Sequence, residues 1–464
     1  MSSSLYRPCQ PRSNRMALFL LATLVVALGA CHRSDTVDFS PHPHPIIVID
    51  IDTLRADRLG CYGNHRNTSP NLDSLAQESI LFKWAFSQAP TTGPSQTTIL
   101  SGLYPTSHGK IPDEAKVPDE AVMLAEALAT AGFRTAGLHD GGYLSDFFNI
   151  GQGFGLYQDF RGQGFSAIVP EAIEWLRSNA ETDFLLFLHT YDTHTPYAPK
   201  EPYRSAFIEG LEPPSPGFEP SVEVMETARL SQYTDSPIVF PNNDIEWAKA
   251  MYDAEILYVD EWVGRLLEEI RSLGLDERAT IIVISDHGEE FQEHGTVLHE
   301  KLYSSVTHVP LMIRLPGGVG AKEVERVVGT IDLMPTLLEM TSVPIPERVE
   351  GTSLLPMMLG LENTDRGGTT YSESPYFGAR RAVVHDTHHL LFTRRDSTVE
   401  VYDFRQDTAE QRDLSKTHHD VTANLRYLLD QWIESTRPLV DASESQEAID
   451  EQTEEQLRAL GYIR

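Results

Sequence analysis

The sequence predicts an α/β fold, with a central, mostly parallel sheet covered by helices and a small C-terminal α+β subdomain. Residues 45–52 form an apolar run without the alternation of a half-exposed strand, as expected for a strand buried on both faces. Similar runs occur at residues 133–138, 184–189 and 279–285. Helical patterns lie between them, and strands that alternate with helices are typical of a doubly wound sheet.

The segments between these runs carry the apolar spacing of amphipathic helices, at residues 70–78, 120–131, 171–179 and 248–273. Residues 201–243 interrupt the pattern, because they are rich in Pro, Ser and acidic side chains and have weak periodicity. We expect this stretch to be an inserted loop region or lid.

The composition changes after a proline-bearing helical segment at residues 331–340. Short apolar runs then predict antiparallel strands at residues 382–384, 389–394 and 399–403. A terminal helix is expected at residues 421–434. We therefore expect a large domain over residues 45–345 and a smaller subdomain over residues 346–464.

The N-terminal residues 1–31 have the pattern of an export signal. Three arginines precede the apolar run 16–27, which is too short to cross a bilayer comfortably, and small residues lead to Cys31. This ending resembles a bacterial lipoprotein processing site, so Cys31 is the expected acylated first residue and 32–44 a tether. We expect an exported protein, lipid-anchored at the outer membrane on the periplasmic face or at the cell surface. An uncleaved signal anchor is the alternative.

The charge of the chain narrows the class of partner. The 464 residues hold 68 acidic and 37 basic side chains, a formal net charge of −31, which argues against nucleic acid as the partner. Any anionic substrate must be held by a metal ion or a few focused basic groups. After processing, Cys61 remains as a single thiol, so no disulfide framework is expected.

Residues 91–102 resemble the start of a helix that faces an anion. Pro94 suits the first helical position and Gly102 the stop. Thr92 would lie just before the helix, near unpaired N–H groups that favour a phosphate, a sulfate or an alkoxide. Taken alone, the segment is better explained as an ordinary Thr/Ser-rich helix cap.

Polar residues follow the predicted buried strands. Asp52 and Asp286 end two of them, and His287 follows directly; His194, His299 and Lys301 lie in polar stretches further along the chain. Singly, the aspartates are as consistent with helix caps, and the histidines with solvated loops. Together, at one edge of a parallel sheet, these side chains and an oxygen nucleophile suit a divalent ion such as Ca²⁺, Mg²⁺, Mn²⁺ or Zn²⁺.

Several motifs together are similar to those of the sulfatase family of the alkaline phosphatase superfamily. They are residues 52–63, 69–73, 91–102, 101–109, 192–194, 285–289, 309–311, 402–403 and 457–462. The resemblance covers nearly all of residues 45–464. It implies an alkaline-phosphatase-like sandwich, a metal-dependent ester hydrolase, and a small-molecule, glycan or lipid ester as substrate.

The resemblance also implies roles for individual residues. Asp52, Asp286 and His287 would bind one divalent metal ion together with the nucleophile at Thr92, supported by Ser95 and Gly288. The side chains that would contact the ester or protonate its leaving group are His194, His299 and Lys301. The short spacing from Lys301 to Tyr303 leaves open an exchange of roles between His299 and Lys301.

Three positions depart from the family pattern. Classical sulfatases form formylglycine from Cys or Ser in Cys/Ser-x-Pro-x-Arg, whereas this chain has Thr92 and Gln96, and Thr53 replaces a second metal-binding Asp. An unmodified Thr resembles the nucleophile of related phosphodiesterases and phosphoethanolamine transferases.

The leading hypothesis is therefore a metal-dependent hydrolase or transferase of sulfate, phosphate or phosphonate esters that acts through Thr92. A catalytically degenerate surface lipoprotein with a binding role is the second hypothesis. A plain formylglycine sulfatase ranks third.

Overall fold

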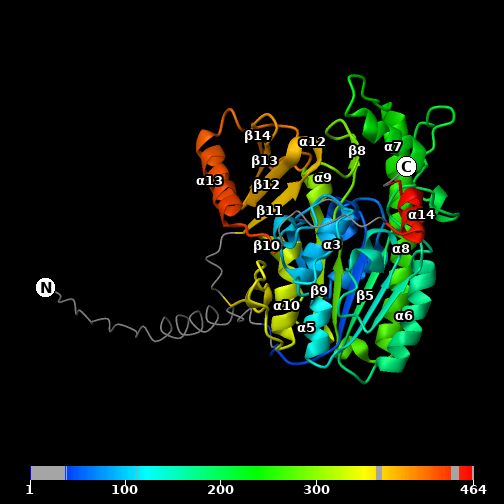
Figure 1. Ribbon diagram of the computed structural model, residues 1–464, viewed down its shortest axis with the longest axis vertical. Helices are drawn as coiled ribbons and strands as arrows, with labels where there is room; N and C mark the ends of the chain where they lie inside the picture. The colour runs from blue at the N-terminus through cyan, green and yellow to red at the C-terminus, as the bar shows by residue number, and fades with distance from the viewer. Residues whose placement is uncertain (2–36, 38, 112, 362–367, 440–448, 462–464) are drawn as a thin grey trace.

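The computed structural model describes residues 1, 37, 39–111, 113–361, 368–439 and 449–461 (Figure 1). Residues 2–31 of the predicted export signal, Cys31 among them, lie outside this set. Within the described part, no helix is long and apolar enough to cross a membrane.

A mixed sheet of eight strands forms the centre of the described structure, in the order β10-β2-β9-β6-β1-β5-β3-β4. Its strands are β1 (Ile46–Ile51), β2 (Ile80–Phe86), β3 (Arg134–His139), β4 (Leu156–Asp159), β5 (Phe184–Thr190), β6 (Thr280–Ile284), β9 (His308–Arg314) and β10 (Lys322–Gly329). β1 pairs in parallel with β5 and β6, whereas β9 runs antiparallel to β2 and β6. The predicted α/β class with a mostly parallel sheet is confirmed.

Helices cover both faces of this sheet (Figure 1). The α-helices of this larger part are α2 (Pro70–Ala76), α3 (Thr92–Ser101), α4 (Pro105–His108), α5 (Leu124–Thr130), α6 (Phe165–Asn179), α7 (Val222–Ser231), α8 (Asn242–Ser272), α9 (Ser304–Thr307), α10 (Leu333–Met340) and α11 (Leu355–Met358), of which α7 and α9 lie beyond one end of the sheet. In β1, Ile47 and Ile49 belong to the core beneath α6 and α8, and Ile46 and Val48 to the core beneath α3, α5 and α10. Two buried faces explain why the predicted strands lacked alternation.

The smaller subdomain is an antiparallel sheet of β11 (Thr369–Ser374), β12 (Arg380–His385), β13 (His388–Thr393) and β14 (Thr398–Asp403). The short α12 (Tyr376–Ala379) precedes β12, and α13 (His419–Ser435) packs on β12 and β13. A two-stranded ribbon of β7 (Glu290–Phe291) and β8 (Val297–Leu298) lies in the segment after β6.

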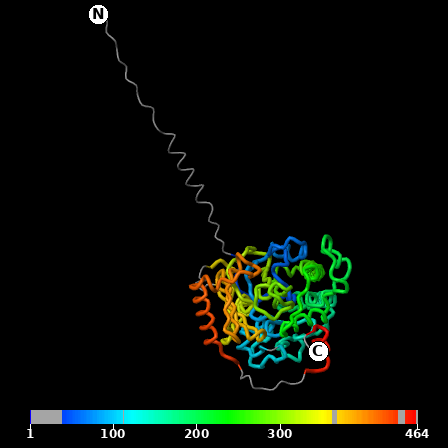
Figure 2. Tube along the Cα trace, turned by 90° about the horizontal axis from the view of Figure 1, so that it is seen from above, coloured from blue at the N-terminus to red at the C-terminus, as the bar shows by residue number. Residues whose placement is uncertain are grey.

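The last helix, α14 (Glu451–Ala459), returns to the large domain. Its Leu457 is fully buried in the core that contains α3 and α5. Figure 2 shows α13 and the C-terminus on opposite sides of the molecule. The predicted domain boundaries stay a prediction. The last described helix was expected in the smaller subdomain, and it packs on the large domain.

Candidate active site

Helix α3 begins two residues earlier than predicted. Thr91, in extended conformation, is the residue before the helix, so Thr92 is the first helical residue and Pro94 the third. The sequence-based placement was wrong because N–H groups throughout the first turn have no helical acceptor, so proline is tolerated at the third position as well. The predicted stop is confirmed: Gly102 has φ 66° and its N–H donates to the carbonyl of Thr98.

The side chains of Asp52, Asp286 and His287 meet in one buried group. Each offers one ligand atom, and these atoms lie within 4.8 Å of one another. The Thr92 hydroxyl donates to Asp52 Oδ1 at 3.1 Å and lies 3.4 Å from His287 Nε2. Because β1 and β6 are parallel neighbours, their carboxyl ends bring these side chains together beside the start of α3.

The charges of this group fit a cation. Asp52 Oδ2 and Asp286 Oδ2 are buried and have no hydrogen-bond partner among the described residues. Burial, and then the neighbouring Asp286, raise the pKa of Asp52 well above its usual range. For Asp286, burial acts in the same direction, but His287 and His189 outweigh it and lower the pKa. A divalent cation would relieve both the desolvation and the repulsion between the carboxylates.

Ser95 and Gly288 support the group as predicted. The Ser95 hydroxyl donates to the carbonyl of Asp286 at 2.6 Å. A Cβ at Gly288 would clash with the carbonyl of Ser305. Thr53 has φ 52°, in the left-handed region, and its N–H lies 3.3 Å from Asp286 Oδ1. At the position where the resemblance expected a second acidic ligand, the backbone of Thr53 contacts the cluster instead.

Two predicted histidines join this group. The ring centres of His287 and His299 are 4.4 Å apart, and those of His299 and His194 are 5.1 Å apart. His194 Nδ1 donates to the carbonyl of Thr195 at 2.8 Å, which leaves Nε2 as the acceptor of the neutral ring. Burial, and then His299, lower the pKa of His194 to about 3; burial also lowers the pKa of His299.

Lys301 has different neighbours. Its ammonium donates to the carbonyl of His294 at 2.6 Å and lies 5.2 Å from the ring centre of Phe377. Burial lowers its pKa, while Glu290 acts in the opposite direction. The described contacts of Lys301 are thus with the loop at His294 and with the smaller subdomain. Its role at the ester stays a prediction.

Sequence reasoning did not assign Tyr191 and His189 to the site. The buried Tyr191 ring lies 4.8 Å from the ring of His189, centre to centre, and burial, followed by the nearby Asp52, raises the pKa of Tyr191 well above its usual range. His189 Nε2 lies 3.8 Å from Asp52 Oδ1, and burial lowers its pKa to about 4. The one available signal was their position at the end of the strand that pairs with β1.

Lys110 and Asp113 were also missed. Asp113 Oδ1 accepts a hydrogen bond from the N–H of Gly93 at 3.0 Å. One of the N–H groups that have no helical acceptor at the start of α3 is therefore bound by a side chain. The buried Lys110 ammonium donates to the carbonyl of Asp113 at 2.6 Å, and burial lowers its pKa to about 7. Their approach to Gly93 depends on tertiary packing, which the sequence pattern did not reveal.

The Gln96 side chain is hydrogen-bonded to Asp50. Its side-chain amide donates to Asp50 Oδ2 at 2.7 Å, and both side chains are fully buried. Burial, and then Asp286, raise the pKa of Asp50 well above its usual range. A neutral amide beside a carboxyl therefore stands where the family pattern has a cation.

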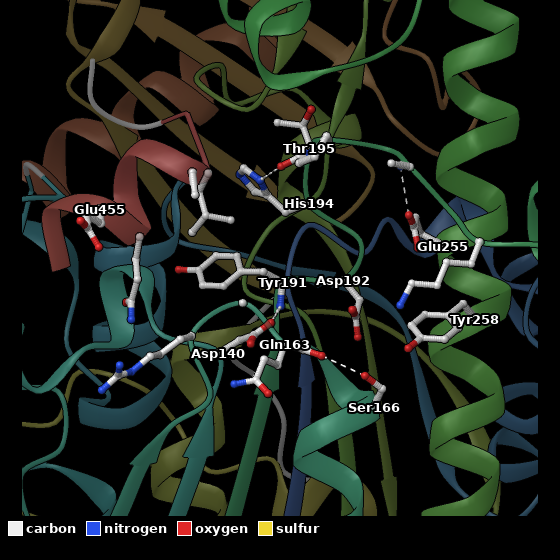
Figure 3. Close-up of a pocket in the computed structure, with 18 of the residues that line it drawn as sticks. Asp140, Gln163, Ser166, Tyr191, Asp192, His194, Thr195, Glu255, Tyr258 and Glu455 are labelled. Atoms are coloured by element: carbon white, nitrogen blue, oxygen red, sulfur yellow. Dashed lines mark hydrogen bonds between the residues drawn. The ribbon is translucent and has the colours of Figure 1, made fainter. Parts of the chain in front are cut away.

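His194 lines two cavities. One, of about 560 Å³, also reaches Tyr191 and Thr195 (Figure 3). The other, of about 50 Å³, also contacts Thr91 and His299 and includes Arg229 from α7. The predicted insert thus supplies part of the wall around the candidate site.

Comparisons with known proteins agree on the family. Residues 44–343 match the sulfatase family, and residues 292–435 match the family described as N-sulphoglucosamine sulphohydrolase, C-terminal. An arylsulfatase of Clostridium perfringens is 24% identical over 415 residues, covering 76% of this chain and 84% of that protein. An ulvan-active sulfatase of Formosa agariphila is 25% identical over 396 residues, covering 78% and 74%.

Solved structures agree on the fold. A complex with the substrate D-glucosamine-2-N,6-O-disulfate has a TM-score of 0.71 at 20% identity, covering 84% of this chain and 98% of that chain. The phosphonate monoester hydrolase of Agrobacterium radiobacter has a TM-score of 0.69 at 19% identity, covering 84% and 95%. The predicted alkaline-phosphatase-like architecture is confirmed.

Proposed function

This chain belongs to the sulfatase family of ester hydrolases, and we propose that it cleaves or transfers sulfate, phosphate or phosphonate esters through an unmodified Thr92. The observation that carries the proposal is the place of the Thr92 hydroxyl, between Asp52 and His287 at the buried acidic group. Purified protein assayed with 4-nitrophenyl esters of sulfate, phosphate and phenylphosphonate tests it. Hydrolysis of none of them, with divalent ions supplied, would contradict the proposal.

The choice of an unmodified hydroxyl rests on the surroundings of Thr92. Its hydroxyl donates to the Asp52 carboxylate, which orients the oxygen of Thr92 at the acidic group. Gln96 is held by Asp50 and carries no charge that could steady a hydrated aldehyde. Both observations favour a hydroxyl nucleophile over formylglycine.

Asp52, Asp286, His287 and Thr92 would hold one divalent metal ion, for which Ca²⁺, Mg²⁺, Mn²⁺ and Zn²⁺ are the candidates. When bound, the ion would polarise a non-bridging oxygen of the ester and lower the pKa of the threonine hydroxyl. The backbone N–H groups of Thr53 and His287 donate to Asp286 Oδ1, and Ser95 donates to the backbone carbonyl of the same residue, so Asp286 is held in place.

His194 and His299 are the candidates for protonating the leaving oxygen. Burial lowers the pKa of both rings, and the negative charge of a bound ester would favour their protonated form, as does Glu289, whose carboxyl lies 3.2 Å from His299 Nδ1. His194 is positioned for this role by the carbonyl of Thr195.

The effect of replacing His299 on kcat/KM should depend on the leaving group of the ester. In His299→Ala, we expect kcat/KM for an alkyl ester to fall by about tenfold more than for a 4-nitrophenyl ester, because nitrophenolate departs without a proton. Parallel kinetics with the two esters measure this. His294→Ala, a loop histidine stacked on Tyr303, is the matched control and should show no such difference. Equal losses for both esters would exclude His299 as the acid.

We also propose export and acyl anchoring at Cys31, on the sequence pattern alone. The full chain expressed in a bacterium should partition into the detergent phase of Triton X-114, and Cys31→Ser should move it to the aqueous phase. Cys61→Ser removes the other retained thiol and should leave partitioning unchanged. Aqueous partitioning of both the wild type and Cys61→Ser would contradict the acyl anchor, and so would detergent partitioning of Cys31→Ser.

A further inference from the structure

The larger cavity beside His194 has one wall made by the C-terminal helix. Figure 3 shows Glu455 of α14 on one side of the cavity, and Glu255 and Tyr258 of α8 on the other. The residues contributed by α14 and its end are Gln452, Glu455, Gln456, Ala459 and Leu460. Residues close to the C-terminal end of the described chain therefore lie beside the candidate active site.

Several contacts hold this wall in place. Gln456 bridges two strand-end segments, because it accepts the N–H of Gly142 at 2.9 Å and donates to Asp159 Oδ2 at 2.7 Å. The hydroxyls of Thr453 and Ser145 lie 3.1 Å apart. Together with the fully buried Leu457, these contacts fix α14 before any ligand binds, and such preorganisation lowers the entropy cost of binding.

The cavity leads to the reacting group. His194 and Thr195 line it at one end, and it is also lined by Tyr191, whose ring centre lies 4.8 Å from that of His189, the neighbour of Asp52. Its volume of about 560 Å³ is within the range of small-molecule sites, roughly 300–1,000 Å³. The alcohol part of an ester that reacts at Thr92 has this space beside it.

The lining mixes polar and apolar groups, and among its charged side chains acidic groups outnumber basic ones. The carboxyls are those of Asp140, Asp192, Glu255 and Glu455, and the cations are Arg161 and Lys200. The Glu255 side chain is 9% exposed, and burial raises its pKa to about 8, so near neutral pH its carboxyl both donates and accepts hydrogen bonds. Such a lining hydrogen-bonds hydroxyls and disfavours a carboxylate by Coulomb repulsion.

We propose that this cavity binds an uncharged, polyhydroxylated alcohol such as a neutral sugar ring, and that Glu455 on α14 is a specificity-determining residue that disfavours an acidic sugar. The proposal rests on the proposed function, because this alcohol would be the leaving group of the ester that the protein cleaves. Glu455 is exposed on the helix surface, so its substitution does not disturb the core.

Calorimetric titration with methyl glucoside and methyl glucuronide tests the proposal, because the two sugars differ in a hydroxymethyl or a carboxylate group. We expect the glucoside to bind at least about fivefold more tightly. Glu455→Gln should reduce this ratio, and Glu455→Lys should reduce it by about tenfold or reverse it. The matched control, Glu451→Gln, alters an exposed residue of the same helix outside the cavity and should keep the wild-type ratio.

Competition completes the test. The glucoside should inhibit hydrolysis of the 4-nitrophenyl ester competitively. Equal affinity for the two sugars, binding of neither, or a ratio unchanged in Glu455→Lys would overturn the proposal. Since titration needs no turnover, a protein that discriminates the sugars but hydrolyses no ester would contradict the proposed function and leave the sugar site standing.

Discussion

Thr92→Ala should lower kcat for ester hydrolysis by about a thousandfold or more, because the covalent step loses its nucleophile. The Thr92 hydroxyl donates to Asp52 and lies beside His287, whereas the hydroxyl of Ser95 in the same turn donates to the backbone carbonyl of Asp286. The measurement is steady-state hydrolysis of the best 4-nitrophenyl ester, with the metal supplied in excess. Thr92→Ser keeps a hydroxyl and should retain measurable turnover.

A second substitution separates this effect from damage to the helix. Thr97 is buried in the same helix, and its hydroxyl donates to the carbonyl of Gly93 at 2.8 Å, away from the acidic group. Thr97→Ala should therefore cost stability without a comparable loss of kcat. Turnover in Thr92→Ala close to that of the wild type would exclude Thr92 as the nucleophile.

Removal of divalent metal should abolish turnover, and the ion should also stabilise the fold. The buried oxygens of Asp52 and Asp286 without hydrogen-bond partners are left uncompensated when no cation is bound. At a metal concentration roughly 100-fold above Kd, binding adds about 2.7 kcal/mol to the free energy of unfolding. Dialysis against chelator, thermal unfolding, and titration with Ca²⁺, Mg²⁺, Mn²⁺ and Zn²⁺ measure both effects.

Asp286→Asn should remove most of the metal-dependent gain in melting temperature and most of the activity. The control is Asp260→Asn, since Asp260 is equally buried but accepts N–H groups at the start of α2. That variant should melt earlier and still gain stability with metal. An Asp286→Asn protein stabilised by metal as much as the wild type would place the ion elsewhere.

The parts of the site that follow buried strands were predictable. Apolar runs without alternation marked β1 and β6, and Asp52 and Asp286 stand directly after or near their ends. Parallel pairing then brings these residues to one edge. The side chains from those positions, together with His194 and His299, lie together as the sequence suggested.

The remaining features of the site and the fold depend on contacts between residues that are far apart in the sequence. Lys110 and Asp113 reach Gly93 through a loop whose path has no periodic signal, and α14 reaches the large domain after the smaller subdomain. The antiparallel β9 inside a largely parallel sheet left no distinctive pattern either. Lys301 was assigned by resemblance, and its described contacts are with His294 and Phe377.

The peptide that contains residue 92 gives the most direct test of the central claim. Its mass should be measured in the resting enzyme and after rapid acid quench during turnover. We predict unmodified threonine at rest, and a sulfo or phospho adduct on Thr92 after the quench, according to the ester used. An aldehyde at residue 92, or an adduct on another residue, would contradict the account.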